Sequence, residues 1–264
     1  NFRSALESAI KLNDGISKLK DSGLSYFMNG RGDKLTEILK SMRDNLKQVI
    51  SSGEEMQKLN ASLSSSVLSN YLNIPEVGDN FGFIKEGYDG QSFFNALINI
   101  FTNPEPQHLL LLFQNSSEIR PSGGFIGSYA DLTIQDGALN SFDVKDIYDP
   151  DGWVQTKTVP PKALQSITTD WESRDANWFA DYKLSAEKVI SRLEDSLFYK
   201  EKNVNFMGAI AINTNVMEDL LTITGPIELP QYNLTITKEN FLEKIQYEVE
   251  AGQKKSKNQP KKIL

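Results

Sequence analysis

The sequence contains no cysteine and a single histidine, His108. The absence of thiols excludes a disulfide scaffold, a cysteine nucleophile, an iron–sulfur cluster and a cysteine-ligated zinc site. A single imidazole also excludes any metal site that requires two histidines. Because His108 stands at the head of an apolar segment, we expect it to be a structural residue rather than the base of a Ser/His/Asp site.

Basic residues are outnumbered, with 28 Lys+Arg against 35 Asp+Glu and a formal net charge of -7. This balance argues against broad nucleic-acid binding, which depends on the neutralisation of phosphates. The sequence also lacks a long apolar run. Its longest unbroken one, Leu109–Phe113, is far shorter than the roughly 18 residues of a membrane span.

Residues 1–102 are predicted to form an N-terminal helical bundle or hairpin. Apolar residues recur there at three- and four-residue steps, the period of an amphipathic helix. The pattern predicts helices over residues 2–19, 35–50, 56–67 and Gln91–Phe101, breaks at Gly30–Asp33 and Ser51–Gly53, and a linker over Asn73–Gly90.

Residues 103–264 are predicted to form an α/β (α+β) domain that is truncated at its C-terminus. Short apolar runs, typical of buried strands, alternate there with helical patterns, which predicts a mixed sheet flanked by helices. Asp136-Gly137 is typical of a two-residue hairpin turn. The expected strands are His108–Phe113, Gly124–Ile134, Ala138–Asp146, Val204–Ile212, Ile227–Leu229 and Leu234–Ile236. The expected helices are Lys183–Phe198, Asn215–Leu221 and Lys238–Ala251, the last capped by Thr237.

The segment Gln114–Ser128 has the highest density of charged, amide and hydroxyl side chains that could bind a ligand. It leaves one expected strand and enters the next through a loop that contains Asn115, Glu118, Arg120 and Ser122. Ligands of α/β sheets tend to bind just beyond strand ends, and an arginine there can hold a phosphate or carboxylate with two hydrogen bonds. The alternative is a structural turn in which Glu118 and Arg120 pair with each other or cap the neighbouring backbone.

A second loop, Trp171–Asp181, contains Arg174 and Asp175 and is suited to line or cover a site. An adjacent Arg-Asp pair also serves simply to fix a loop. If this loop covers the face that carries Arg120, then Arg120 is a half-buried ion-pair partner, which is the outcome we favour.

An acidic group follows the predicted hairpin and could bind a hard cation through its oxygens. It comprises Asp143, Asp146, Asp149 and Asp151. The spacing does not match an EF-hand, so we favour a solvated acidic loop. No metal ligand is assigned, and the candidates are Asp146, Asp149 and Asp175.

Parts of the sequence resemble the bacterial family DUF4012, a domain of unknown function. The resemblance covers roughly residues 108–264 and is carried by Gln114-Asn115, Glu118–Ser128, Asp136-Gly137, Arg174–Asn177, Gly208–Ile212 and Thr224–Pro226. Members usually place this domain outside the membrane, behind a transmembrane helix and a helical region. The resemblance therefore implies an extracytoplasmic cell-envelope protein, tethered by an N-terminal anchor that is absent from this sequence. It implies no activity.

A looser resemblance, in element order, is to the LytR-CpsA-Psr family. Val204–Gly208, Val216–Leu221 and Gly225–Leu229 are similar to that family in order and spacing. Those enzymes transfer glycopolymers from polyprenyl pyrophosphate to the cell wall, and they hold the pyrophosphate with arginines and an Asp-bound Mg²⁺. The resemblance implies a LytR-CpsA-Psr-like fold and would give this role to Arg120, Arg174 and Asp175.

Two functions remain open at this point. The first, which we favour, is a binding or scaffolding module whose partner is an envelope glycan, a lipid-linked glycan or an envelope protein. The second is a glycopolymer transferase with Mg²⁺ as its cofactor. Residues 103–236 contain three arginines, Arg120, Arg174 and Arg192, which is few for a pyrophosphate pocket. Whether the chain is an enzyme is not decided by the sequence.

Overall fold

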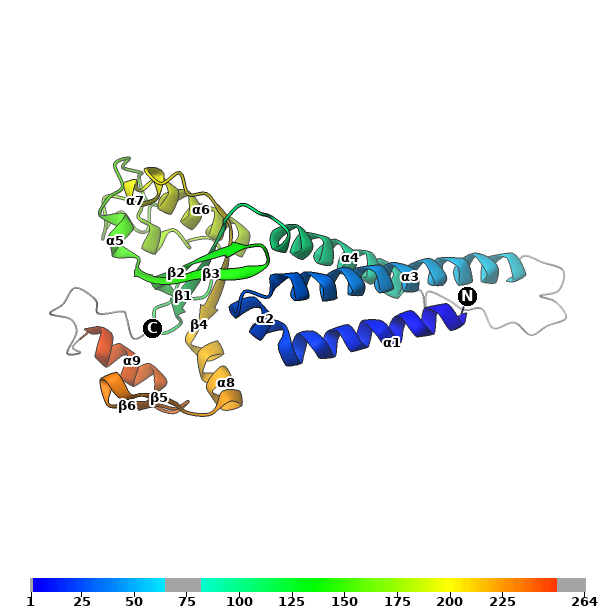
Figure 1. The fold of residues 1–264 in the computed structure, drawn as a ribbon. Helices are drawn as coiled ribbons and strands as arrows, with labels where there is room; N and C mark the ends of the chain where they lie inside the picture. The colour runs from blue at the N-terminus through cyan, green and yellow to red at the C-terminus, as the bar shows by residue number, and fades with distance from the viewer. Residues whose placement is uncertain (1, 65–81, 251–264) are drawn as a thin grey trace. The chain divides into compact units, whose positions relative to one another are not determined.

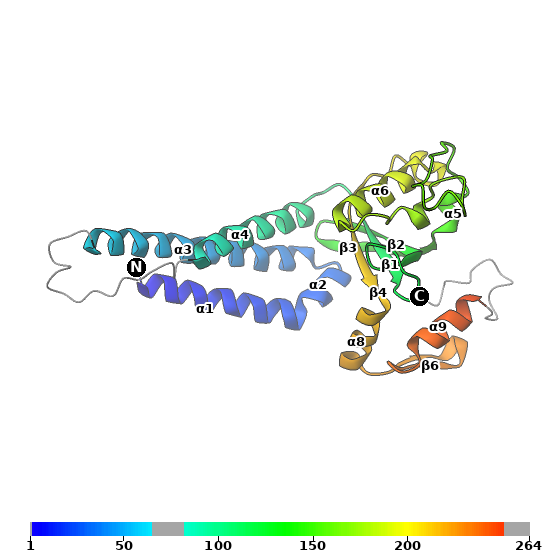
Figure 2. The same cartoon turned by 180° about the vertical axis from the view of Figure 1, so that it is seen from behind.

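The computed structural model describes residues 2–64 and 82–250 (Figures 1 and 2). The chain divides into two compact units, and each is described by itself. One contains Asn1–Pro106 and Ile134–Asn140, and the other contains Gln107–Thr133 and Ser141–Leu264. Within the described ranges, no helix combines the length and the apolar character needed to cross a membrane.

The first unit is mainly helical, as predicted (Figure 1). Its elements are α1 (Phe2–Lys18), the π-helical turn η1 (Leu19–Gly23), α2 (Leu24–Met28), α3 (Gly32–Ser64) and α4 (Gly82–Phe101). Both α1 and α4 pack against the long helix α3. Leu35, Leu39 and Ile98 form the buried core of this unit.

The predicted break at Ser51–Gly53 is wrong, because α3 runs through it without interruption. Gly53 is buried where α3 meets α4, and a Cβ built on it would lie 2.8 Å from Cζ of Phe83. The expected linker is also wrong over residues 82–90, which belong to α4. There Gly87 lies against Ile50. These glycines allow two helices to approach closely, and neither ends a helix. Residues 73–81 of the expected linker lie outside the described ranges.

The second unit is built on a four-stranded mixed sheet, which confirms the predicted fold class. The strands are β1 (Gln107–Asn115), β2 (Phe125–Gln135), β3 (Ala138–Asp146) and β4 (Phe206–Asn213), in the order β3-β2-β1-β4. β1 and β4 run parallel, with Leu110 opposite Ala209. The hairpin turn between β2 and β3, which is grouped with the first unit, is the predicted one. Asp136 and Gly137 have φ values of 49° and 73°, the left-handed backbone that such a turn requires.

Helices and short elements complete this unit (Figure 2). They are α5 (Tyr148–Asp151), the 3-10 turn η3 (Ser173–Asp175), α6 (Tyr182–Asp195), α7 (Leu197–Lys200), α8 (Thr214–Thr224), β5 (Ile227–Leu229), the 3-10 turn η4 (Pro230–Tyr232), β6 (Leu234–Ile236) and α9 (Phe241–Glu250).

The boundaries of three helices differ from the prediction. α8 runs over Thr214–Thr224 where Asn215–Leu221 was expected. The helix expected to reach Phe198 is split at Ser196, whose extended backbone ends α6 and whose hydroxyl caps α7. The last helix begins at Phe241 rather than Lys238. Thr237 does not cap it, because the Thr237 backbone N–H instead donates to Oδ1 of Asn240 at 2.8 Å.

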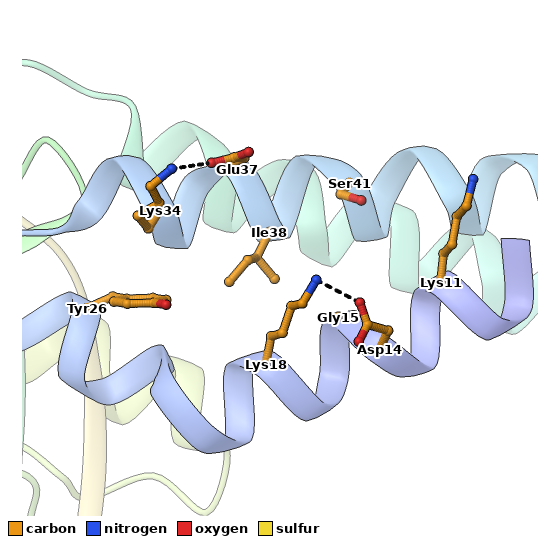
Figure 3. Close-up of a pocket in the computed structure, with 9 residues that line it drawn as sticks. All are labelled: Lys11, Asp14, Gly15, Lys18, Tyr26, Lys34, Glu37, Ile38 and Ser41. Carbon is orange, nitrogen blue, oxygen red and sulfur yellow. Dashed lines mark hydrogen bonds and ion pairs between the residues drawn. The ribbon is translucent and has the colours of Figure 1, made fainter.

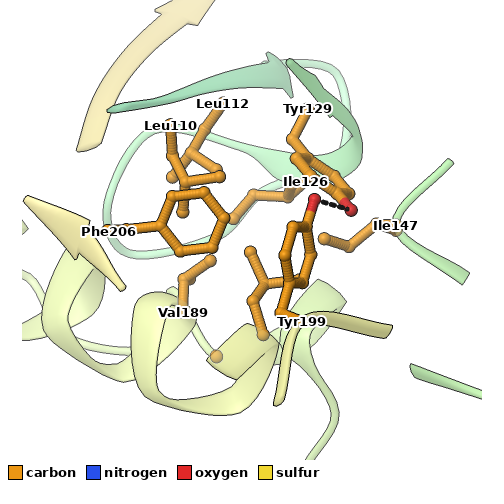
Figure 4. Packing of buried hydrophobic residues seen from close by; sticks show 10 residues of the cluster. Leu110, Leu112, Ile126, Tyr129, Ile147, Val189, Tyr199 and Phe206 are labelled. Carbon is orange, nitrogen blue, oxygen red and sulfur yellow. Dashed lines mark hydrogen bonds between the residues drawn. The ribbon is translucent and has the colours of Figure 1, made fainter. Parts of the chain in front are cut away.

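The core of the sheet unit joins β1, β2 and β4 to α6 and α7 (Figure 4). Leu110, Val189 and Phe206 are among its buried side chains. Tyr129 and Tyr199 meet in this core through a hydrogen bond of 2.7 Å between their hydroxyls, and burial raises the pKa of both phenols. His108 is hydrogen-bonded at the edge of the core, with Nδ1 2.9 Å from Oδ1 of Asp131.

Candidate functional site

Two loops that are distant in sequence meet at an ion-pair cluster. Nη2 of Arg120, from the loop between β1 and β2, donates to Oδ1 of Asp175 at 3.2 Å. Nε of Arg174 lies 3.7 Å from the other oxygen of Asp175, Oδ2, and Nη2 of Arg174 pairs with Glu172. Asp175 therefore bridges two guanidinium groups. We call Arg120, Glu172, Arg174 and Asp175 the arginine cluster.

The arginine cluster is largely closed to solvent. The exposed fraction of the side chain is 21% for Arg120, 23% for Arg174 and 9% for Asp175. An aromatic ring covers each guanidinium: Arg120 lies 5.1 Å from the ring centroid of Phe125, and Arg174 lies 4.7 Å from that of Tyr148. Both positive charges thus have a carboxylate partner and a ring within the domain itself.

The local backbone explains why Arg120 reaches Asp175. The backbone N–H of Gly123 donates to the carbonyl of Arg120 at 3.1 Å, which closes a turn. Gly124 follows with φ 143°, and a Cβ there would lie only 2.4 Å from the carbonyl oxygen of Asn115. Only glycine fits this conformation without strain, so the loop folds tightly onto the end of β1.

Asn177 and Ser122 join the two loops to each other. Nδ2 of the buried Asn177 donates to the carbonyl of Gly124 at 2.6 Å. The hydroxyl of Ser122 donates to the backbone carbonyl of Asn177 at 3.2 Å. The sequence singled out Ser122 as a candidate ligand-binding residue, and in the structure its hydroxyl holds the second loop in place.

The pairing of Glu118 with Arg120 is wrong, but the other form of the structural turn is present, because Nη1 of Arg120 donates to the neighbouring carbonyl of Ile119 at 3.0 Å. Glu118 is exposed and accepts a hydrogen bond of 3.1 Å from Nδ2 of Asn115, while Arg120 pairs with Asp175. Asn115 and Glu118 thus form a separate surface pair. The half-buried ion pair that we favoured for Arg120 is present, with Asp175 as its partner.

Asp151 anchors the site from α5, a role that the sequence did not reveal. Its Oδ1 accepts a hydrogen bond from the backbone N–H of Ser173 at 2.8 Å, and its Oδ2 accepts one from the N–H of Arg174 at 3.4 Å. Burial raises the pKa of Asp151, while these hydrogen bonds oppose that rise. The sequence showed that Asp151 belongs to an acidic loop. It did not show the partners of Asp151, because they lie more than 20 residues away along the chain.

The acidic residues do not gather into a metal site in the part of the chain that the structure describes. No three His, Asp or Glu side chains converge there as metal ligands. Asp146 accepts the backbone N–H of Tyr148 at 3.0 Å, and Asp175 is engaged by two guanidiniums. Mg²⁺ requires a near-octahedral set of oxygen ligands. The residues around Asp175 do not offer that set.

Aromatic side chains border the arginine cluster, and we call Tyr148, Trp171 and Phe179 the aromatic rim. Tyr148 is 50% exposed and Phe179 is 37% exposed. The ring centroids of Trp171 and Phe179 are 6.0 Å apart, and the indole N–H of Trp171 donates to the carbonyl of Asp175 at 2.9 Å. Apolar ring surface next to paired charges can hold a neutral polar molecule that has both C–H faces and hydroxyl groups.

One family model matches the chain. It carries the description "Protein of unknown function (DUF4012)" and matches residues 104–249. No curated protein and no solved structure matches. The matched segment includes the arginine cluster, the aromatic rim and all four strands of the mixed sheet.

Proposed function

Because this chain belongs to the DUF4012 family, whose domain has no established activity, we propose that the sheet unit is a binding module of the bacterial cell envelope that recognises a neutral glycan. The surface that would bind the glycan is the aromatic rim beside the arginine cluster. The resemblance of the sequence to extracytoplasmic proteins supports the envelope location.

One observation carries the proposal: both candidate arginines are already neutralised within the domain. Asp175 bridges Arg120 and Arg174, and Glu172 adds a second carboxylate. A pyrophosphate carries two or more negative charges and would have to displace these carboxylates from a cluster that is about four-fifths buried. A neutral sugar does not compete for the guanidiniums. Its C–H face can pack on exposed rings such as Tyr148 while its hydroxyls bond to polar groups at the rim.

A transferase that acts on lipid-pyrophosphate-linked glycans is the second candidate. The convergence of Arg120 and Arg174 on one carboxylate favours it, because two guanidiniums beside an aspartate are the groups that such an enzyme would use. The likeness to the LytR-CpsA-Psr fold stays a prediction. The groups around Asp175 do not fit Mg²⁺, since two guanidiniums engage the Asp175 carboxylate.

The proposal is tested by titrating the intact chain with solubilised, neutral cell-wall glycan strands in a calorimeter. We expect saturable binding that Tyr148→Ala weakens about tenfold, the loss typical of a central aromatic contact. Phe142→Ala is the matched control, because Phe142 is similarly exposed at 46% but lies on β3, outside the rim. Absence of glycan binding, or equal weakening by both variants, would overturn the proposal.

The location is tested separately. An enzymatic reporter that is active only outside the cytoplasm is joined after residue 264 of the protein in its bacterial host. We expect reporter activity at the outer side of the membrane. Activity confined to a cytoplasmic reporter at the same position would contradict an envelope role.

A further inference from the structure

The helical unit contains a cavity of about 420 Å³ between α1, α2 and α3 (Figure 3). Its volume lies within the range of small-ligand sites. The lining residues are Lys11, Asp14, Gly15, Lys18, Tyr26, Lys34, Glu37, Ile38 and Ser41. All of them belong to one compact unit and lie outside the segment matched by the family model.

The charges in this cavity do not cancel. Lys18 pairs with Asp14 at 2.7 Å, and Lys34 pairs with Glu37 at 3.0 Å. The third lysine, Lys11, has no ion-pair partner among the residues that the structure describes. Three lysines against two carboxylates leave one positive charge uncompensated, in a protein whose net charge is -7.

The other lining groups give the cavity an apolar side and two hydroxyls. In Figure 3 the side chain of Ile38 extends from α3 toward α1, next to Lys18 and facing the ring of Tyr26. Ser41 supplies a hydroxyl from α3, and Tyr26 supplies a phenol from α2. The guanidinium of Arg31 lies 4.9 Å from the ring centroid of Tyr26, which adds a further cation at that end. Ammonium and hydroxyl donors from three helices line this cavity, which suits an anion such as phosphate.

The π-helical turn η1 explains how Tyr26 comes to line the cavity. Lys11 and Lys18 are seven residues apart and therefore share one helical face, on which the next position of an uninterrupted α-helix would be Ser25. The π-helical turn η1 adds one residue to the helix. As a result Tyr26, and not Ser25, lies on the same face as Lys11 and Lys18. Such turns are rare and are frequently found at functional sites.

We propose that this cavity binds a phosphate group attached to a partly apolar molecule. Lys11 provides the uncompensated charge, and Lys18, whose side chain is 60% exposed, can exchange Asp14 for the anion at little cost. The hydroxyls of Tyr26 and Ser41 provide further donors, and Ile38 contacts the apolar part. The phosphate can come from a soluble phosphorylated compound or from a lipid headgroup, because both present the same chemistry to these side chains.

The test is an NMR titration of the intact chain with inorganic phosphate, in parallel with binding to phosphatidylcholine vesicles with and without phosphatidylglycerol. We expect saturable shifts of the Tyr26 and Ser41 amides that weaken as salt is added. Lys11→Gln and Lys18→Gln should each lower the affinity about three- to tenfold. Lys47→Gln is the matched control, because Lys47 is exposed on α3 and does not line the cavity.

The phosphate titration and the vesicle experiment distinguish a soluble phosphorylated ligand from a lipid headgroup. Binding of phosphate alone assigns a soluble ligand, whereas binding that requires phosphatidylglycerol and is lost in Lys18→Gln assigns a lipid headgroup. Deletion of Ser22 removes the extra residue of η1 and turns Tyr26 by about 100° out of the cavity, so it should weaken either kind of binding. The proposal is wrong if neither probe binds saturably, or if Lys47→Gln weakens binding as much as Lys18→Gln.

Discussion

Replacement of Arg120 by alanine measures how much the arginine cluster contributes to the stability of the sheet unit. Removal of one partner from a fully buried ion pair costs about 3–5 kcal/mol, because the other charge is left buried. In this protein the cost should be smaller. Arg120 is 21% exposed, and Arg174 stays 3.7 Å from Asp175 and partly compensates its charge. We therefore expect Arg120→Ala to lower the free energy of unfolding by about 2 kcal/mol, which corresponds to a drop of about 4–8 °C in Tm.

Tryptophan fluorescence is the right assay, because all 3 tryptophans, Trp153, Trp171 and Trp178, lie in the sheet unit. Glu118→Ala is the matched control, and we expect it to change the free energy of unfolding by less than about 0.5 kcal/mol, as is usual for an exposed site. Addition of Asp175→Asn to Arg120→Ala should recover part of the loss, since no charge is then stranded. A Tm of Arg120→Ala within about 1 °C of the wild type would refute this reasoning.

Three further predictions concern the surroundings of this cluster. Gly124→Ala places a Cβ 2.4 Å from the carbonyl oxygen of Asn115 at a φ of 143°, so it should destabilise the sheet unit by about 2 kcal/mol or more in urea unfolding; wild-type stability would show that the loop relaxes freely. Tyr129→Phe removes the buried hydrogen bond to Tyr199 and should cost about 1 kcal/mol by the same measurement, whereas an unchanged midpoint would mean that the hydroxyl pair contributes nothing. Burial raises the pKa of Asp151 above its ordinary value of 3.8, so the folded state holds this proton more tightly than the unfolded state. Stability should therefore fall as the pH rises from about 3.8 through the raised pKa, and Asp151→Asn should flatten that part of the pH profile; an identical profile for the variant would contradict this assignment.

β1 was predictable because it is a short apolar run, and β2 and β3 were predictable as extended runs on either side of a hairpin turn. Asp136-Gly137 specifies its hairpin through two residues that accept left-handed backbone. The helix boundaries were less predictable. Gly53 follows two serines, as a helix end often does, yet it is buried against α4. A glycine that ends a helix and a glycine that lets two helices approach look alike in a single sequence.

The sequence identified the residues of the candidate site but not which of them form ion pairs with one another. Arg120, Arg174 and Asp175 stood out because charged residues cluster in loops that follow or precede strands and helices. The nearest acid in sequence, Glu118, was the obvious partner for Arg120, but the ion pair forms with Asp175, 55 residues away. Contacts across such a separation depend on how two loops fold over the sheet, which local spacing does not encode. The same reason hid the role of Asp151.

The guanidiniums of Arg120 and Arg174 are ion-paired with carboxylates of their own domain, and we infer that they do not form a pyrophosphate pocket. The most direct test follows the Nε–H resonances of these two arginines by NMR while the intact chain is titrated with inorganic pyrophosphate in the presence of Mg²⁺. Our account predicts that both resonances stay in place, with no saturable shift at millimolar pyrophosphate. Saturable shifts of both resonances, abolished in Asp175→Asn or Arg120→Ala, would contradict it and favour the transferase.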